Sequence, residues 1–99
     1  MKFKLGRLVA TSGATEAMLQ CEQFSEEVNQ CIYKHLTGDY GTVSLDEHDT
    51  KMNEDSIING QVKRFGRVLS RYELSKGDVY IITERVQSTI TTILFTSEY

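Results

Sequence analysis

The residue types with the clearest chemical potential stand together in one segment, His35-Leu36-Thr37-Gly38-Asp39-Tyr40-Gly41. A nearby aspartate can orient a histidine side chain for acid–base chemistry. The same pattern also suits the end of a helix, where a partly positive histidine is stabilised by the helix dipole and an aspartate favours a turn. The two flanking glycines readily adopt the positive φ that such a turn requires. The segment therefore predicts either a small polar site or a loop that terminates a helix.

A ligand site at this loop would need further polar groups from the predicted sheet. The candidates are polar or amphipathic strand positions, and the whole candidate pocket is His35, Asp39, Tyr40, Arg67, Ser70, Tyr72, Glu84 and Thr92. Arg67 is the one nearby cation that its strand could direct toward the loop. A nucleotide or another small anion is therefore the ligand class that this pocket favours.

Other catalytic or metal-binding patterns are missing from the sequence. The spacing of histidines and aspartates fits no compact metal-ligand motif, and neither Ser70 nor Ser88 has the neighbours of a nucleophile elbow. Cys21 and Cys31 lie on predicted helices in a chain without an export signal, so we expect two reduced thiols. We predict no catalytic residue, no metal and no cofactor.

Two groups of like charge offer binding surfaces. In the basic group, Arg67 and Arg71 share one face of a predicted strand, where they could accept an anion or simply solvate an edge strand. It comprises Lys63, Arg64, Arg67 and Arg71. The acidic run LDEHDTKMNED is either a solvated helix face or an electrostatic docking surface for a basic partner. The predicted partner surface comprises Asp39, Tyr40, Asp46, Glu47, Asp49, Glu54 and Asp55.

Length and composition limit the class of protein. The 99 residues predict a single domain over residues 1–99, with 39% hydrophobic and 25% charged residues, as in ordinary globular chains. The net charge of -3 argues against direct nucleic-acid binding. Neither a leader nor a stretch long enough to span a bilayer is visible, so we expect a cytoplasmic protein without membrane contacts.

The last third of the chain predicts three consecutive strands rich in β-branched and aromatic residues. They cover residues 65–74, 79–86 and 88–95. In the middle strand, alternation places Val79, Ile81 and Thr83 on one face of the sheet. Both faces are largely apolar. We therefore expect helices over one face, and either an N-terminal strand or a second copy of the chain over the other, which makes a homodimer one expectation.

Three helices are predicted before these strands, over roughly residues 14–22, 26–36 and 45–58. Thr11 or Ser12 caps the first helix, and Gly38 ends the second. A capping box from Ser44 to Glu47 opens the third, which Asn59-Gly60 ends. A strand over residues 6–11 could lie at the sheet edge. The predicted class is α+β, with helices of the N-terminal half packed on a C-terminal three-stranded antiparallel β-meander and a short N-terminal strand as an addition.

Short motifs along nearly the whole chain carry a resemblance to a known family. They are Val9-Ala10-Thr11, Gly13-Ala14, His35, Gly38-Asp39-Tyr40-Gly41, Asp49, Asn53, Leu69-Ser70, Tyr72, Ile81-Ile82-Thr83-Glu84, Thr91-Thr92-Ile93-Leu94 and Glu98-Tyr99. In their order the chain resembles small bacterial proteins carried on plasmids, integrative elements and phages, described as plasmid-related or restriction-associated. Tyr40 stands where that family usually has tryptophan.

The resemblance implies a mobile element inside a bacterial host cell. Small acidic proteins of such elements often inhibit host defence by binding a restriction enzyme or a CRISPR effector, which requires a complementary surface and no active site. We therefore hypothesise an inhibitor of a nucleic-acid-targeting defence system that binds its host protein directly. The alternative hypothesis is a small-ligand or nucleotide-binding module, or a minimal enzyme, that uses the loop of His35, Asp39 and Tyr40.

Overall fold

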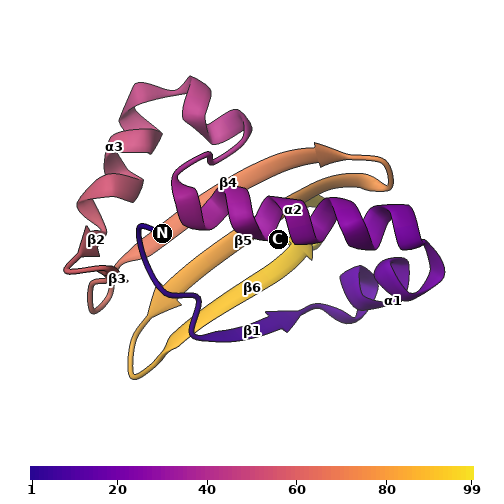
Figure 1. Cartoon of the computed structure of the whole chain (residues 1–99), viewed down its shortest axis with the longest axis horizontal. Coiled ribbons are helices and arrows are strands. Elements are labelled where there is room, and N and C mark those ends of the chain that lie inside the picture. The colour runs from indigo at the N-terminus through magenta and orange to yellow at the C-terminus, as the bar shows by residue number, and fades with distance from the viewer.

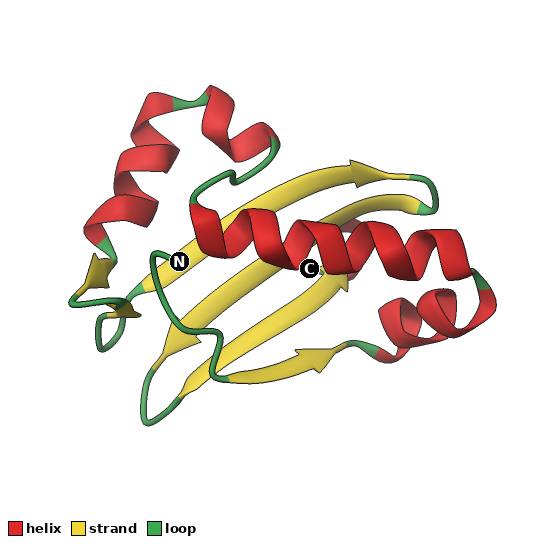
Figure 2. Ribbon diagram, in the orientation of Figure 1, coloured by secondary structure: helices red, strands yellow, loops and turns green.

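The computed structural model describes residues 1–99 as an α+β fold with a four-stranded mixed sheet and a separate two-stranded sheet (Figures 1 and 2). The large sheet has the order β1-β6-β5-β4, from β1 (Arg7–Ala10) through β6 (Thr89–Phe95) and β5 (Gly77–Arg85) to β4 (Arg67–Leu74). Helices α1 (Ser12–Gln20) and α2 (Glu22–Thr37) pack on one face of it. No helix is both long and apolar enough to cross a membrane.

The sheet contains the predicted three strands β4, β5 and β6, and β1 lies within the predicted edge strand over residues 6–11. β4, β5 and β6 are antiparallel neighbours, as the alternation indicated, but β1 adds to the outer edge of β6 in parallel, with Leu8 opposite Thr91. The sheet is therefore mixed. The expected order of helices first and strands last holds only coarsely, because β1 precedes the helices and a hairpin follows the third one.

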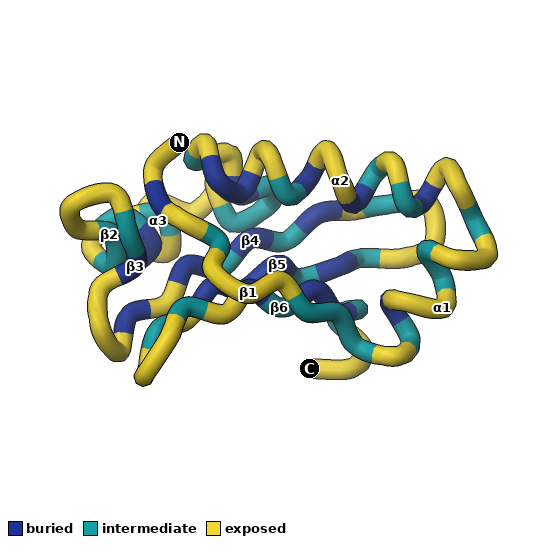
Figure 3. Tube along the Cα trace, turned by 60° about the horizontal axis from the view of Figure 1, so that its bottom comes forward, coloured by how far each residue is buried: buried dark blue, intermediate teal, exposed yellow.

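The alternation of apolar residues decides which side chains meet α2. Val79, Ile81 and Thr83 of β5 are buried toward the helix. Val79 and Ile81 pack with Phe24 and Val28 of α2, and Thr83 meets His35. The opposite face of the sheet carries no α-helix. Figure 3 shows α2 on one face and the C-terminal end of the chain on the other, where η2 (Thr96–Glu98) follows β6.

The first two helices follow the predicted capping closely. Thr11 caps α1 by accepting a hydrogen bond from the Ala14 N–H at 3.2 Å, and Gly38 ends α2 with φ of 94°. α2 begins at Glu22, four residues earlier than predicted, so only Cys21 separates it from α1. This tight joint brings α1 beside the N-terminal half of α2, and Phe24 is fully buried.

The third helix, α3 (Glu47–Asp55), is capped differently from the prediction. Asp46 is its N-cap and accepts from the Asp49 N–H at 3.1 Å, so the proposed capping box from Ser44 is wrong. Ser44 instead lies in η1 (Thr42–Leu45) and accepts from the Tyr40 N–H at 2.9 Å. The helix ends at Asp55 because the next residues form a hairpin.

That hairpin joins β2 (Ile57–Ile58) to β3 (Gln61–Val62) through Asn59 and Gly60. Both turn residues have positive φ, 53° and 75°, as a two-residue turn of the primed type requires. Asn-Gly between two short β-prone segments, Ile57-Ile58 and Gln61-Val62, is a strong local signal for such a turn. The prediction that Asn59-Gly60 ends a helix reaching residue 58 is therefore wrong, because a hairpin starts at Ile57.

Candidate functional site

His35 is fully buried between α2 and the sheet and is hydrogen-bonded on both ring nitrogens. Nδ1 lies 2.5 Å from the Ser70 Oγ, and Nε2 lies 2.9 Å from the Thr83 Oγ1. Thr83 in turn contacts the Thr91 hydroxyl at 2.7 Å, and Thr91 donates to the Leu5 carbonyl at 2.8 Å. These groups form one continuous chain through the core, from β4 across the sheet to the segment before β1.

The last acceptor fixes the direction of every proton in this chain. Because the Thr91 proton goes to a carbonyl, Thr83 must donate to Thr91, and the His35 Nε2–H must donate to Thr83. Nδ1 is then unprotonated and accepts from Ser70. The ring is a neutral donor–acceptor, and burial lowers its pKa from 6.5 to about 4. No buried side-chain polar atom lacks a partner, so this cluster has structural partners for all of its groups.

Asp39 and Tyr40 hold the loop after α2 in place through hydrogen bonds. The Asp39 Oδ1 accepts from the Gly41 N–H at 3.2 Å, which makes the Asx turn that the sequence favoured. Its carbonyl accepts from the Tyr72 hydroxyl at 2.7 Å. Tyr40 is fully buried, and its hydroxyl donates to Glu54 at 3.1 Å. Burial, and then the neighbouring Glu54 carboxylate, raise the pKa of Tyr40. The loop therefore anchors α3 to α2.

The eight residues of the predicted pocket do not form one site, because the sheet separates them. His35, Tyr40, Ser70 and Tyr72 lie together on the helix-covered face. The other sheet residues of the set lie on the opposite face; they are Arg67, Glu84 and Thr92. The reason is the period of two along a strand: Ser70 and Tyr72 differ from Arg67 by odd numbers of positions, so their side chains point to opposite sides.

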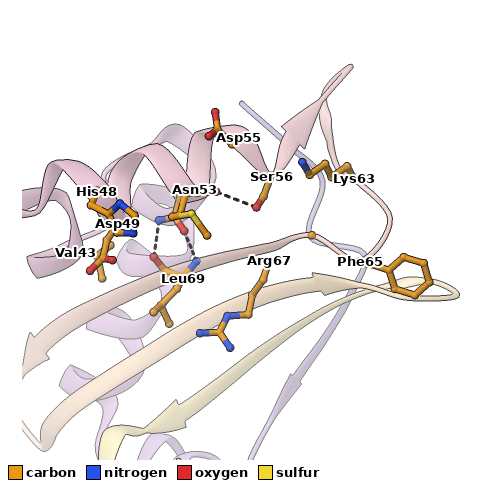
Figure 4. Close-up of a pocket in the computed structure, with 12 residues that line it drawn as sticks. Val43, His48, Asp49, Asn53, Asp55, Ser56, Lys63, Phe65, Arg67 and Leu69 are labelled. Atoms are coloured by element: carbon orange, nitrogen blue, oxygen red, sulfur yellow. Dashed lines mark hydrogen bonds between the residues drawn. The ribbon is translucent and has the colours of Figure 1, made fainter.

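The largest depression of the surface is a groove of about 640 Å³ between α3 and the start of β4 (Figure 4). One side, the α3 bank, is lined by Asp49, Met52 and Asp55, and the other, the loop bank, is lined by Lys63, Phe65 and Arg67. Met52 is 56% exposed and Phe65 73% exposed. The groove thus combines exposed apolar side chains with opposite charges on its two banks.

This groove receives only part of the predicted partner surface. Asp49 and Asp55 line it, and Asp46 and Glu47 are exposed beside it. Tyr40 is in the core. The Glu54 carboxylate forms a salt bridge with Lys2 at 2.6 Å and accepts a hydrogen bond from the Tyr40 hydroxyl, so it helps to hold α3 in place. The free acidic charge of this surface therefore consists of Asp46, Glu47, Asp49 and Asp55, together with Asp39 in the neighbouring loop.

Asn53 holds α3 beside the edge of the sheet, and sequence reasoning gave it no role. Its side-chain amide donates to the Leu69 carbonyl at 2.7 Å, and its oxygen accepts from the Leu69 N–H at 2.9 Å, as drawn in Figure 4. Two residues along β4, the Arg71 N–H donates to the Tyr40 carbonyl at 3.1 Å. These contacts occupy the outer backbone groups at the centre of β4 and prevent pairing with another strand there.

Comparison of the chain with protein-family models, with curated proteins and with solved structures finds no match. The geometry therefore carries the functional argument, and the resemblance to mobile-element proteins stays a prediction. No group of three or more histidine, cysteine, aspartate or glutamate side chains is arranged to hold a metal ion. Cys31 is buried, and burial raises the pKa of its thiol to about 11.

Proposed function

We propose that the protein is an accessory protein of a mobile element or phage and inhibits a host nucleic-acid-targeting defence enzyme by binding it through the α3 bank. One observation carries this proposal: exposed Met52 lies between the unpaired carboxylates of Asp49 and Asp55 in the largest surface groove. An apolar side chain with charged groups on either side resembles the apolar centre and polar rim of protein interfaces.

The attachment of α3 supports a role in binding. Asn53, Tyr40 and Glu54 fasten the inner side of the helix, so its outer side is presented in a fixed orientation. A rigid surface loses less conformational entropy on association than a mobile one. Its carboxylates would face a basic surface, such as the channel of a restriction enzyme or CRISPR effector that normally holds nucleic acid.

The test is restoration of phage plating on a host with an active defence system. Expression of the protein should raise the plating efficiency, and the purified protein should bind the purified defence enzyme with an affinity that falls as salt rises. The double variant Asp49→Asn/Asp55→Asn should lose both effects. Its folding should be little changed, because Asp49 lies at the favourable end of the helix dipole and Asp55 at the unfavourable end.

A matched control removes the same charge elsewhere. Glu22→Gln/Glu26→Gln neutralises two carboxylates at the start of α2, away from the groove, and should inhibit defence as the unaltered chain does. Equal activity of both double variants would refute the α3 bank as the contact surface. Failure to protect phage against restriction or CRISPR interference, with a folded protein present, would refute the proposed function.

A further inference from the structure

We infer that the loop of residues 63–67 binds single-stranded nucleic acid, with Phe65 as a stacking platform and Lys63, Arg64 and Arg67 as phosphate contacts. This loop joins β3 to β4 and forms the bank of the groove opposite α3. The inference concerns the other bank of the same groove and a different ligand from the proposed function, and neither depends on the other.

The backbone at Phe65 is the first reason. Phe65 has φ of 65°, in the left-handed region that glycine and asparagine occupy readily and that other residues avoid. Its N–H donates to the Arg85 carbonyl, and the Arg85 N–H donates to the Gly66 carbonyl, so two residues oppose one as in a β-bulge. The position that favours glycine in such a bulge is here held by a large aromatic residue.

Burial does not compensate for this conformation. The Phe65 side chain is 73% exposed, whereas phenylalanine normally stabilises a fold by being removed from water. The surrounding backbone is nevertheless fixed, because the Lys63 N–H donates to the Ser56 carbonyl and the Gly66 N–H to the Lys63 carbonyl, each at 2.8 Å. A strained residue held rigidly with an apolar ring toward solvent is typical of a binding position.

The charge around the ring identifies the ligand class. The Arg64 guanidinium lies 5.1 Å from the centre of the Phe65 ring, and Lys63, Arg64 and Arg67 are all exposed and outside the two salt bridges of the protein. Arg67 is oriented by donating to the Tyr99 hydroxyl at 2.8 Å. An exposed ring for a base, with Arg64 beside it and with Lys63 and Arg67 within two residues of it in the chain, matches a single strand of nucleic acid. Such a strand binds stacking surfaces and cations without needing a helix that reads a groove.

The net charge of -3 argued against binding of nucleic acid, but the basic residues gather on this loop and the acidic ones on α3 across the groove. Carboxylates face this loop from two elements: Asp49 and Asp55 from α3, and Glu84 from β5, which lies opposite Arg67. They would repel a strand and confine it to the loop. We therefore expect a short contact of about three phosphates, with a slope of log affinity against log salt of about -2.

The probe is a fluorescein-labelled oligothymidylate of about 12 nucleotides, titrated with the full chain and followed by anisotropy at about 50 mM salt. Phe65→Asn should weaken binding about fivefold or more, because the ring is lost. Asparagine tolerates positive φ, so this variant should keep or raise the urea midpoint of the protein. Phe65→Trp should retain binding, and Arg64→Gln should weaken it and make the salt slope shallower.

The control Lys76→Gln removes a cation from the exposed turn between β4 and β5 and should leave binding unchanged. The inference is overturned if the oligothymidylate does not bind, if Phe65→Asn binds as tightly as the unaltered chain, or if Lys76→Gln weakens binding as much as Arg64→Gln. Equal binding of an oligoglutamate peptide, independent of Phe65, would assign the loop to an acidic protein instead. Should Phe65→Asn fail to fold, the inference is still tested by Arg64→Gln, which must weaken binding, and by Phe65→Trp, which must retain it. The two proposals fail separately: Asp49→Asn/Asp55→Asn should lose defence inhibition and still bind the oligothymidylate.

Discussion

Acid should destabilise this protein through His35. The folded state holds the ring neutral with a pKa of about 4, whereas the unfolded chain protonates it near 6.5. Between these values the unfolded state binds more protons, so the free energy of unfolding rises with pH there. Stability contributed by the neutral ring is complete above about pH 6.5 and is lost as pH falls toward 4. The lowering of the His35 pKa from 6.5 to about 4 corresponds to about 3 kcal/mol.

The structure explains the size of this effect. A second proton would have to go on Nδ1, which accepts from the Ser70 hydroxyl at 2.5 Å. Ser70 would then have to rotate its own proton elsewhere, and the charge would sit in a core position with no exposed surface. Phe3 packs against the imidazole in a T-shaped arrangement, with the two ring centres 5.1 Å apart, and is itself almost fully buried. Both desolvation and the donor arrangement oppose protonation.

The assay is urea unfolding of the unaltered chain and of His35→Gln at several pH values from 7.5 to 4. Since carboxylates also titrate in the lower part of this range, the relevant quantity is the difference between the two proteins. His35→Gln should be less stable at pH 7.5, because a buried hydrogen bond is lost, and the difference should shrink by about 3 kcal/mol toward pH 4. Exposed His48→Gln is the matched control and should run parallel to the unaltered chain. A constant difference between His35→Gln and the unaltered chain across the range would refute the buried neutral histidine.

Two further changes test how α3 and its loops are held. Asn53→Ala should lower the free energy of unfolding by about 2–4 kcal/mol, since it leaves both Leu69 backbone groups without partners. It should also increase self-association in sedimentation, because the β4 edge is then open. Unchanged stability would contradict the role given to the two Asn53–Leu69 bonds. Gly41→Ala should destabilise far more than Gly60→Ala in thermal melts, because both have positive φ but only at Gly41 would the added Cβ lie 1.9 Å from a carbonyl oxygen, that of Arg71. Equal losses would mean that the Gly41 loop can move away.

The sheet could be predicted from the sequence because its information is local. Alternation along Val79 to Glu84 assigned each side chain to its face, and the apolar stripe of α2 and Gly38 were equally readable. The parallel addition of β1 to β6 could not be predicted, since it pairs Leu8 with Thr91 across almost the whole chain. The Asn59-Gly60 hairpin was a different kind of failure. Its signal was local, but the helix-like polar run before it led us to extend α3 too far.

The site was harder to predict because partners of polar residues are set by tertiary structure. The sequence grouped His35, Ser70 and Tyr72 in a candidate ligand pocket, and His35 and Ser70 do meet each other. What they lack is an opening to solvent, which no spacing of residues reveals. Asn53 looked like one more polar residue of an acidic helix. Its two bonds to Leu69 become visible only when α3 lies beside β4.

Residues held in unfavourable conformations or exposed against their preference are a better guide to a binding site here than polar residue types alone. In the core around His35, every donor and acceptor has a partner, so nothing there needs a ligand. At the groove, by contrast, Met52 and Phe65 expose large apolar surfaces, and Phe65 does so in a backbone conformation unfavourable to it. Sequences that fold well usually satisfy local preferences, and departures from them tend to occur where binding imposes its own demands. Both proposals therefore rest on the two banks of the groove and not on His35, whose polar atoms already have partners within the protein.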